Sequence, residues 1–259
     1  MTVIRLRCST TDNYHYLIAC RATRKAAAVD PLDVGLILET ARREGLAITH
    51  VLNTHTHWDH VGGNEELLAE TRAALVVNRI EADAVEAERL EAIEGGDAFK
   101  VGDVEVRTLH TPGHTPGGTT FIVGKNLIVG DTLFVAGCGN PNYGGNAEQL
   151  YETVARRLRA FPDDFTVWPG HNYCDKNLRF ALDVEPSKAA AKRFLDEVRR
   201  VEAGGAEPRA TTIGDEKAHN PFFRLDSAAL LARLRETKPD LAGDARGVFL
   251  ALRARRDVF

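Results

Sequence analysis

One stretch of the chain decides its fold and its chemistry: Thr54-His55-Thr56-His57-Trp58-Asp59-His60. It contains three imidazoles and one carboxylate. Residues 48–53, just before it, are largely β-branched and apolar, which predicts a buried strand. The glycines that follow and the apolar pattern of residues 64–71 predict a turn into a helix, with Asn64 as its N-cap. The stretch therefore lies at the carboxyl end of a strand, where α/β proteins commonly place their sites.

This histidine-rich stretch suits a metal ion. In an extended backbone alternate side chains point to the same side, so His55 and His57 share one face. The turn that follows can bring Asp59 and His60 back toward them. Imidazole and carboxylate groups at this density are typical of zinc or a similar first-row metal. A polar loop that merely contains histidines is the competing interpretation, and the density of ligands argues against it.

Composition narrows the class of protein. The chain has 259 residues, of which 44% are hydrophobic and 27% charged, enough for a full core and one or two domains. Its formal net charge of −4 argues against a nucleic-acid binder, since such domains are usually strongly basic. Four cysteines are scattered without a C-x-x-C pair, which predicts free thiols in a reducing compartment. They are Cys8, Cys20, Cys138 and Cys174.

The N-terminal sequence gives no targeting signal. Residues 1–7 alternate like a strand and lack the apolar core and cleavage site of a signal peptide. No stretch approaches the roughly 20 apolar residues of a membrane span. We therefore expect a cytoplasmic monomer with neither a membrane nor a nucleic-acid partner.

Strand and helix patterns alternate through the first part of the chain. The expected strands are residues 2–7, 13–20, 25–29, 48–53, 74–77, 104–110, 119–123, 127–129 and 165–168. The expected helices among them are residues 33–44, 64–71, 80–94 and 146–160. Because several neighbouring strands are joined by tight turns, the pattern favours a mixed sheet layered against helices.

The composition changes after His171, where helical patterns replace strands. The expected helices there are residues 173–183, 187–202, 227–236 and 244–254. We therefore divide the chain into an α/β domain, residues 1–172, and a smaller all-α domain, residues 173–259.

Three later turns repeat the arrangement of the first motif, in which a strand ends and a coordinating side chain follows. They are Thr111-Pro112-Gly113-His114, Gly130-Asp131-Thr132 and Pro169-Gly170-His171. Each alone is an ordinary turn. Together with the first motif, in this order, they predict that distant parts of the chain converge on one metal site.

In this combination the sequence resembles the metallo-β-lactamase superfamily, whose αββα sandwich carries two metal ions at one edge. The resemblance implies that one ion is held by His55, His57 and His114. It implies that the other is held by Asp59, His60 and His171, with Asp131 bridging both. The remaining histidines fall outside this pattern, and we interpret them as core or surface residues. They are His15, His50, His110 and His219.

Two divalent ions suit hydrolysis. Ions roughly 3.5–4 Å apart share a water molecule and lower its pKa toward neutrality. The resemblance gives catalytic roles to Asp59, which would also orient the hydroxide, and to Asp131. We expect zinc, and the same ligands tolerate iron or manganese.

A closer resemblance, to hydroxyacylglutathione hydrolases (glyoxalase II), covers nearly the whole chain. It rests on Gly130–Gly139, Pro169–Tyr173, His219-Asn220-Pro221-Phe222 and Arg253–Asp257. It implies cleavage of S-2-hydroxyacylglutathione, such as S-D-lactoylglutathione, to glutathione and a 2-hydroxy acid (D-lactate), the second step of methylglyoxal detoxification. The helical domain would then bind the glutathione part of the thioester.

Four side chains would contact that substrate: Tyr143, Tyr173, Arg253 and Arg256. The two arginines are three residues apart, so on a helix they share a face that can grip a carboxylate. Solvated helix charge is the alternative interpretation of this arginine pair. A thiol can attack a thioester, but we interpret Cys138 as a packed cysteine because activated water already fills that role.

Two departures from the family pattern leave the substrate open. Asn140 stands where the family usually has a basic residue, and Gly118 stands where the second histidine of an extended Thr-Pro-Gly-His run is usual. The physiological thiol and acyl group are therefore undecided. Competing functions are a persulfide dioxygenase with a single iron, a thioesterase or lactonase using another thiol carrier, and a metal-stabilised binding protein.

Overall fold

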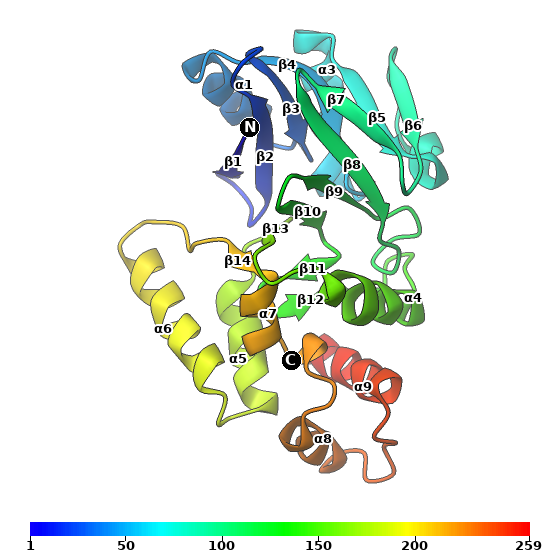
Figure 1. Ribbon diagram of the computed structural model, residues 1–259, viewed down its shortest axis with the longest axis vertical. Coiled ribbons are helices and arrows are strands. Elements are labelled where there is room, and N and C mark those ends of the chain that lie inside the picture. The colour runs from blue at the N-terminus through cyan, green and yellow to red at the C-terminus, as the bar shows by residue number, and fades with distance from the viewer. The chain divides into compact units, whose positions relative to one another are not determined.

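The first six strands form a mixed sheet of order β1-β2-β3-β4-β5-β6 (Figure 1). Its strands are β1 (Thr2–Arg7), β2 (Tyr14–Cys20), β3 (Lys25–Val29), β4 (Ala47–Leu52), β5 (Ala74–Asn78) and β6 (Leu90–Ile93). The first three pair antiparallel, and β3 to β6 pair parallel. The expected mixed sheet is confirmed, and the motif begins just beyond the carboxyl end of β4.

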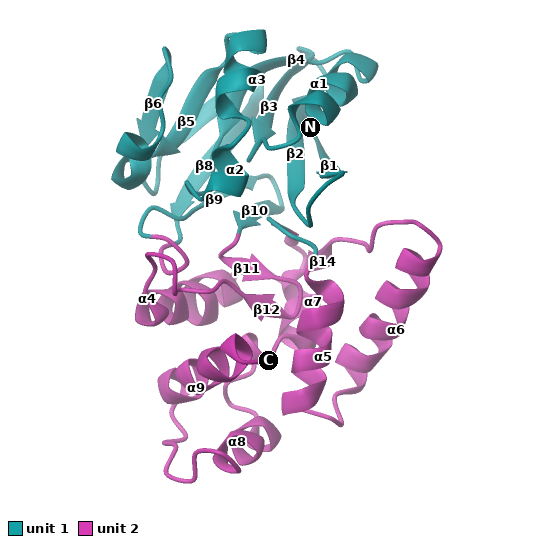
Figure 2. Cartoon of the chain, turned by 180° about the vertical axis from the view of Figure 1, so that it is seen from behind, with its two compact units in different colours: residues 1–111, 116–130, 169–172 teal, residues 112–115, 131–168, 173–259 magenta.

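This computed structural model describes all residues from 1 to 259, which form two compact units (Figure 2). Unit 1 comprises Met1–Thr111, Pro116–Gly130 and Pro169–Asn172. Unit 2 comprises Pro112–Thr115, Asp131–Trp168 and Tyr173–Phe259. Two short segments, residues 112–115 and 169–172, thus belong to a different unit from their neighbours in the chain. Each carries a histidine of the predicted metal site.

Helices α1 (Val34–Arg43) and α3 (Asn64–Thr71) pack on the first sheet, with the short α2 (Trp58–Val61) between them in the chain. Helix α1 buries Val34, Ile37 and Ala41 among sheet residues, because these apolar positions repeat at helical spacing. The expected helix at residues 64–71 is confirmed, but Asn64 is its first residue and Gly63 the N-cap. The Asn64 side chain is buried instead.

A second, antiparallel series of strands completes unit 1. It consists of β7 (Ala98–Val101), β8 (Val104–His110), β9 (Thr119–Val123) and β10 (Asn126–Gly130), each paired with the next. Strand β7 contacts β2 and β3 of the first sheet. Farther along, β13 (Thr166–Pro169) pairs antiparallel with β14 (Thr211–Thr212).

The helix expected at residues 80–94 is wrong. Arg79–Ala84 forms a 3₁₀ helix, η1, and Leu90–Ile93 forms β6, which pairs with β5. The apolar residues in this segment are sparse, and glutamates separate them. Pairing with the buried strand β5 satisfies the backbone hydrogen bonds of residues 90–93. A helix over this segment would have had only a weak apolar face to pack against the sheet.

Unit 2 is mainly helical. Its helices are α4 (Ala147–Tyr151), which continues as π-helix η2 (Glu152–Arg157) and 3₁₀ helix η3 (Leu158–Ala160), α5 (Cys174–Val184), α6 (Ala189–Ala203), α7 (Ile213–His219), η4 (Pro221–Phe223), α8 (Ala228–Arg235) and α9 (Ala245–Asp257). The four expected C-terminal helices are present, whereas α7 was not expected. A two-stranded hairpin, β11 (Leu133–Phe134) and β12 (Gly137–Cys138), packs its turn against α5 and α6. None of the helices is both long and apolar enough to cross a lipid bilayer.

Candidate metal centre

Asp59, His60 and His171 form the first group of candidate ligands. The Nε2 atom of His171 lies 3.2 Å from Nε2 of His60 and 3.3 Å from Oδ2 of Asp59. The Nε2 atom of His60 lies 3.6 Å from the same carboxylate oxygen. Both imidazoles are buried. The structure thus brings His171 to the motif across 111 residues of sequence.

Backbone hydrogen bonds fix the position of His171. Gly170 donates through its N–H to the carbonyl of Gly130 at 2.9 Å and accepts from the N–H of Tyr14 at 2.8 Å. His171 itself forms an isolated β-bridge with Asn13. The loop after β13 is therefore held between the start of β2 and the end of β10. Asp131 is the residue directly after β10.

Asp30 determines how His60 faces this group. Its carboxylate accepts from Nδ1 of His60 at 3.0 Å and from the N–H and hydroxyl of Thr54 at 2.7 and 2.6 Å. Because a carboxylate only accepts, neutral His60 carries its proton on Nδ1. The lone pair of Nε2 then points toward Asp59 and His171, as in metal sites whose second layer orients the ligands.

Asp59 is an anion at neutral pH. Burial raises its pKa, but hydrogen bonding with His171, the electrostatic interaction with His60 and a hydrogen bond from Asn13 outweigh this effect. The pKa of Asp59 is therefore held well below its usual range. The Nδ2 group of Asn13 donates to both the carboxylate and the carbonyl of Asp59, each at 3.1 Å.

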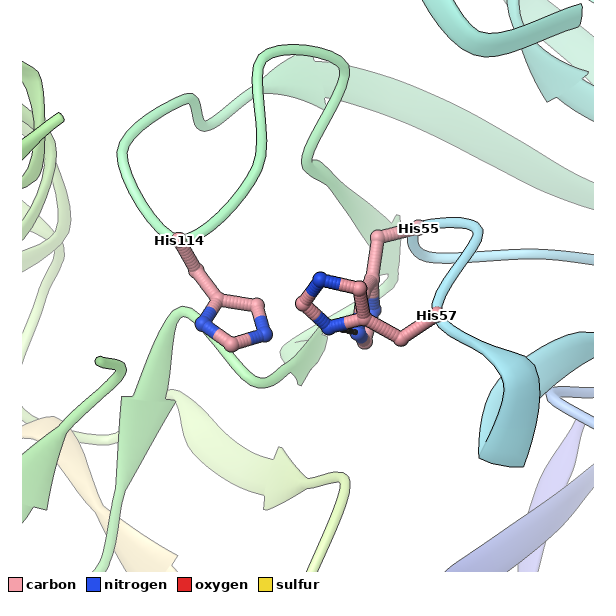
Figure 3. Close-up of side chains that lie close together, drawn as sticks. All are labelled: His55, His57 and His114. Atoms are coloured by element: carbon pink, nitrogen blue, oxygen red, sulfur yellow. Dashed lines mark hydrogen bonds between the residues drawn. The ribbon is translucent and has the colours of Figure 1, made fainter. Parts of the chain in front are cut away.

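A second group joins His55, His57 and His114, whose rings turn toward one another in Figure 3. One ligand atom from each residue lies within 4.8 Å of the other two. The Nε2 atom of His55 is 3.1 Å from Nδ1 of His57. These are the three residues that the resemblance assigns to one of the two ions.

His114 is oriented by a backbone carbonyl and faces Asp131. Its Nδ1 atom lies 2.7 Å from the carbonyl oxygen of Asn140, so a neutral ring carries its proton there. Its Nε2 lone pair then faces Oδ2 of Asp131 at 3.7 Å. Two acceptors that face each other in a buried position need a proton or a cation between them. The residues present therefore fit divalent metal ions.

Two buried carboxylates of this region escaped the sequence analysis. Asp30 directly follows the strand expected at residues 25–29, and no motif there indicates a role for it. Glu81 lay in the helix expected wrongly at residues 80–94. Its Oε2 atom accepts from the N–H and the hydroxyl of Thr56 at 2.9 and 3.0 Å, and its Oε1 atom accepts from the N–H of Gly117 at 2.7 Å. Glu81 thus ties the loop between the first two histidines to the segment that follows residues 112–115.

The residues predicted to bind substrate have varied surroundings. Tyr143 is 72% exposed, and Tyr173 packs edge-on against Phe134. Arg256 donates to Oδ1 of Asn177 at 3.0 Å. Arg253 is buried, and its guanidinium donates to backbone carbonyls and to a carboxylate. Their contacts with substrate stay a prediction.

The cysteines and the remaining histidines behave as packed or peripheral groups. All four thiols are free and buried, and burial raises the pKa of Cys138 to about 11. His15 is buried with Nδ1 2.7 Å from the carbonyl oxygen of Asp30, and His219 is buried against Glu216.

Comparison with known proteins places the whole chain. Residues 19–171 match the metallo-beta-lactamase superfamily, and residues 172–259 match the hydroxyacylglutathione hydrolase C-terminus. The hydroxyacylglutathione hydrolase of Polaromonas sp. (strain JS666 / ATCC BAA-500) is 46% identical over 95% of this chain and 94% of its own length. That of Nitrosococcus oceani is 42% identical over the same shares.

The crystal structure of ETHE1 from Myxococcus xanthus has a TM-score of 0.69 and 28% identity, covering 100% of this chain and 99% of that one. These matches confirm the expected α/β sandwich with a smaller helical C-terminal region. The chain therefore belongs to the hydroxyacylglutathione hydrolases of the metallo-beta-lactamase superfamily.

Proposed function

We propose that the protein is a metal-dependent thioester hydrolase that cleaves S-2-hydroxyacylglutathiones, such as S-D-lactoylglutathione, to glutathione and a 2-hydroxy acid such as D-lactate. This is the second step of methylglyoxal detoxification. The match of residues 172–259 to the C-terminus of this family carries the proposal. It favours the hydrolase over the persulfide dioxygenase suggested by the first domain alone.

Seven residues would hold two divalent ions. His55, His57 and His114 would hold one, Asp59, His60 and His171 the other, and Asp131 would bridge them. The imidazole and carboxylate donors suit zinc, with iron or manganese as alternatives. When bound, the ions supply a water of lowered pKa and polarise the thioester carbonyl.

The chain's own residues orient this chemistry. The Asp30 carboxylate and the Asn140 carbonyl hold His60 and His114 in the tautomers that turn Nε2 inward. Asp59 stays ionised and would orient the attacking water by accepting a hydrogen bond from it. The leaving thiolate has a thiol pKa near 8.5, so no strong general acid is needed.

A cysteine nucleophile does not fit. Cys138 is buried, and its pKa is raised to about 11, so the thiol stays protonated at neutral pH. Replacing Cys138 with alanine should therefore leave thioester hydrolysis largely intact.

The helical region would bind the glutathione part through Tyr143, Tyr173, Arg253 and Arg256. Asn140 offers no charge for a substrate carboxylate, because its side-chain amide is neutral. Its Oδ1 atom accepts from the N–H of Asn142 at 2.8 Å. We infer that Arg256 of α9 carries that contact. We further propose that the protein works as a cytoplasmic monomer.

A panel of thioesters tests this function. Metal-loaded protein should release free thiol from S-D-lactoylglutathione faster than from the same acyl group on coenzyme A or cysteamine. The Asp131→Ala variant should release none and should lose at least one ion. Oxygen consumption with glutathione persulfide would favour the dioxygenase. Equal stabilisation by metal with no turnover on any thioester would favour a binding protein.

A further inference from the structure

The hairpin of residues 131–140 carries two parts of the metal centre. Asp131 lies at its start, and the carbonyl of Asn140, which accepts from His114, lies at its end. Between them only two residue pairs of β11 and β12 are in register. A two-stranded hairpin is at best marginally stable alone, and this one is very short. Its shape must therefore be fixed by other contacts.

Helix α7 and the residue after it provide two of these contacts. The Oε2 atom of Glu216 accepts from the N–H of Ala136 at 2.9 Å. The Nδ2 group of Asn220 donates to the carbonyl of Gly137 at 3.0 Å and to Glu216 at 2.8 Å. Ala136 has a φ of +52°, which a residue with a side chain rarely adopts. The Glu216 contact holds the turn at this strained position.

Helices α5 and α9 provide the other two contacts. The Nδ2 group of Asn177 donates to the carbonyl of Val135 at 3.1 Å. The Nη1 group of Arg253 donates to the carbonyls of Cys138 and Gly139 at 2.9 and 3.0 Å. A side chain at Gly137 would come within 2.6 Å of the Asn177 amide, so the helix lies directly on the hairpin.

These four polar side chains are all buried: Asn177 is 3% exposed, Glu216 and Asn220 are 0%, and Arg253 is 6%. Each contact is specific, because every one joins a side-chain donor or acceptor to a backbone group of the hairpin. Buried polar groups that lose their partners are costly, so the contacts define one shape of the hairpin.

We propose that Asn177, Glu216, Asn220 and Arg253 are positioning residues of the metal centre. They hold the hairpin so that Asp131 faces Nε2 of His114 while the Asn140 carbonyl fixes Nδ1. The helical region would then do more than bind substrate, since it would also fix the conformation of the hairpin that carries Asp131 and Asn140. This inference rests on the metal centre of the proposed function but not on the thioester, and its test needs no turnover.

The test compares two neighbouring residues of α7. Glu216→Ala removes the contact with Ala136. Asp215→Ala, the matched control, removes a helix cap and an ion pair with Arg209 but touches no hairpin atom. The readouts are the ¹⁵N signals of the His114 ring in metal-free protein, and zinc affinity measured by competition with a chelator.

We expect Glu216→Ala to shift the His114 signals toward a mixture of tautomers and to weaken zinc binding roughly 10- to 100-fold. Glu216→Gln should restore both, because its amide oxygen can still accept from Ala136. Asp215→Ala should lower the thermal midpoint and leave both readouts unchanged. Unaltered His114 signals and zinc affinity in Glu216→Ala would overturn the proposal.

A second variant covers the case in which Glu216→Ala does not fold. Asn177→Asp keeps the side-chain volume and the acceptor for Arg256 but loses the one donor to Val135. It should change the His114 signals and zinc affinity in the same direction, by a smaller factor. A folded Asn177→Asp protein with wild-type values for both would equally contradict the positioning role.

Discussion

Nδ1 of His60 lies 3.0 Å from Oδ2 of Asp30, a residue 30 positions earlier that is itself almost fully buried. This contact fixes the tautomer of His60 and hence the direction of the lone pair on Nε2. Asp30 also anchors Thr54, the residue before the first histidine of the motif. One carboxylate therefore sets both the start of the motif and the orientation of its last imidazole.

Asp30→Asn should weaken metal binding. An amide that presents its NH₂ group to His60 favours the proton on Nε2 and removes the lone pair that a metal needs. We expect a loss of roughly 10- to 100-fold in zinc affinity, measured by chelator competition. Asp33→Asn is the control, since Asp33 caps α1 nearby without touching His60. Equal affinities for Asp30→Asn and the wild type would show that the contact has no orienting role.

Glu81→Gln should disturb the first group of histidines. Both carboxylate oxygens accept hydrogen bonds, so the NH₂ group of glutamine must face a donor at Thr56 or at Gly117. We expect zinc affinity to fall about 10-fold, with Glu66→Gln on the exposed face of α3 unchanged. Gly117→Ala should act in the same direction, because its Cβ would approach Glu81 to 2.7 Å. Isothermal titration with zinc would reveal whether Glu81 matters.

Arg253→Ala should destabilise the fold whatever it does to substrate binding. The guanidinium is buried and donates to two carbonyls and to Asp257. Removing it leaves these acceptors without a donor, and we expect the free energy of unfolding to fall by about 2–4 kcal/mol. Denaturant unfolding at neutral pH measures this loss.

Arg256→Ala should instead raise KM more than it lowers kcat, because Arg256 lies at the proposed glutathione contact.

Stability should depend on pH through Asp215. Burial raises its pKa, but hydrogen bonds from Arg209 and from the N–H of Thr212 outweigh this and hold the pKa below its usual range. A carboxyl whose folded pKa lies below its unfolded value, about 3.9, stabilises the fold above that value. The contribution is lost as pH falls through the folded pKa. The gap in unfolding free energy between wild type and Asp215→Asn should be full at pH 7 and vanish in strong acid. A gap that is constant with pH would refute this linkage.

Local sequence patterns indicate the candidate metal ligands more readily than the residues that orient them. In the histidine motif and in each of the three later turns, the candidate ligand lies within a few residues of the strand end that marks it. Asp30 and Glu81 act on residues 24 and 25 positions away, so no spacing near them marks their role. The contacts of Arg253 with the hairpin span 114 and 115 residues.

The prediction of secondary structure was wrong where strand pairing in the folded protein outweighed a weak local pattern. Spaced apolar residues between 80 and 94 suggested a helix, but residues 90–93 gain more by extending the parallel sheet beside β5. The apolar pattern does not predict helix α7, because its seven residues carry few apolar positions. The local signal for this helix is the capping box at Thr212 and Asp215.

We expect a histidine and carboxylate centre with two metal ions to hydrolyse the glutathione thioester. The most direct measurement adds zinc stepwise to metal-free protein and follows thiol release from S-D-lactoylglutathione on the same sample. Activity should rise with zinc until two equivalents are bound and disappear when a chelator removes them. Fully metal-loaded, folded protein that releases no thiol would contradict it.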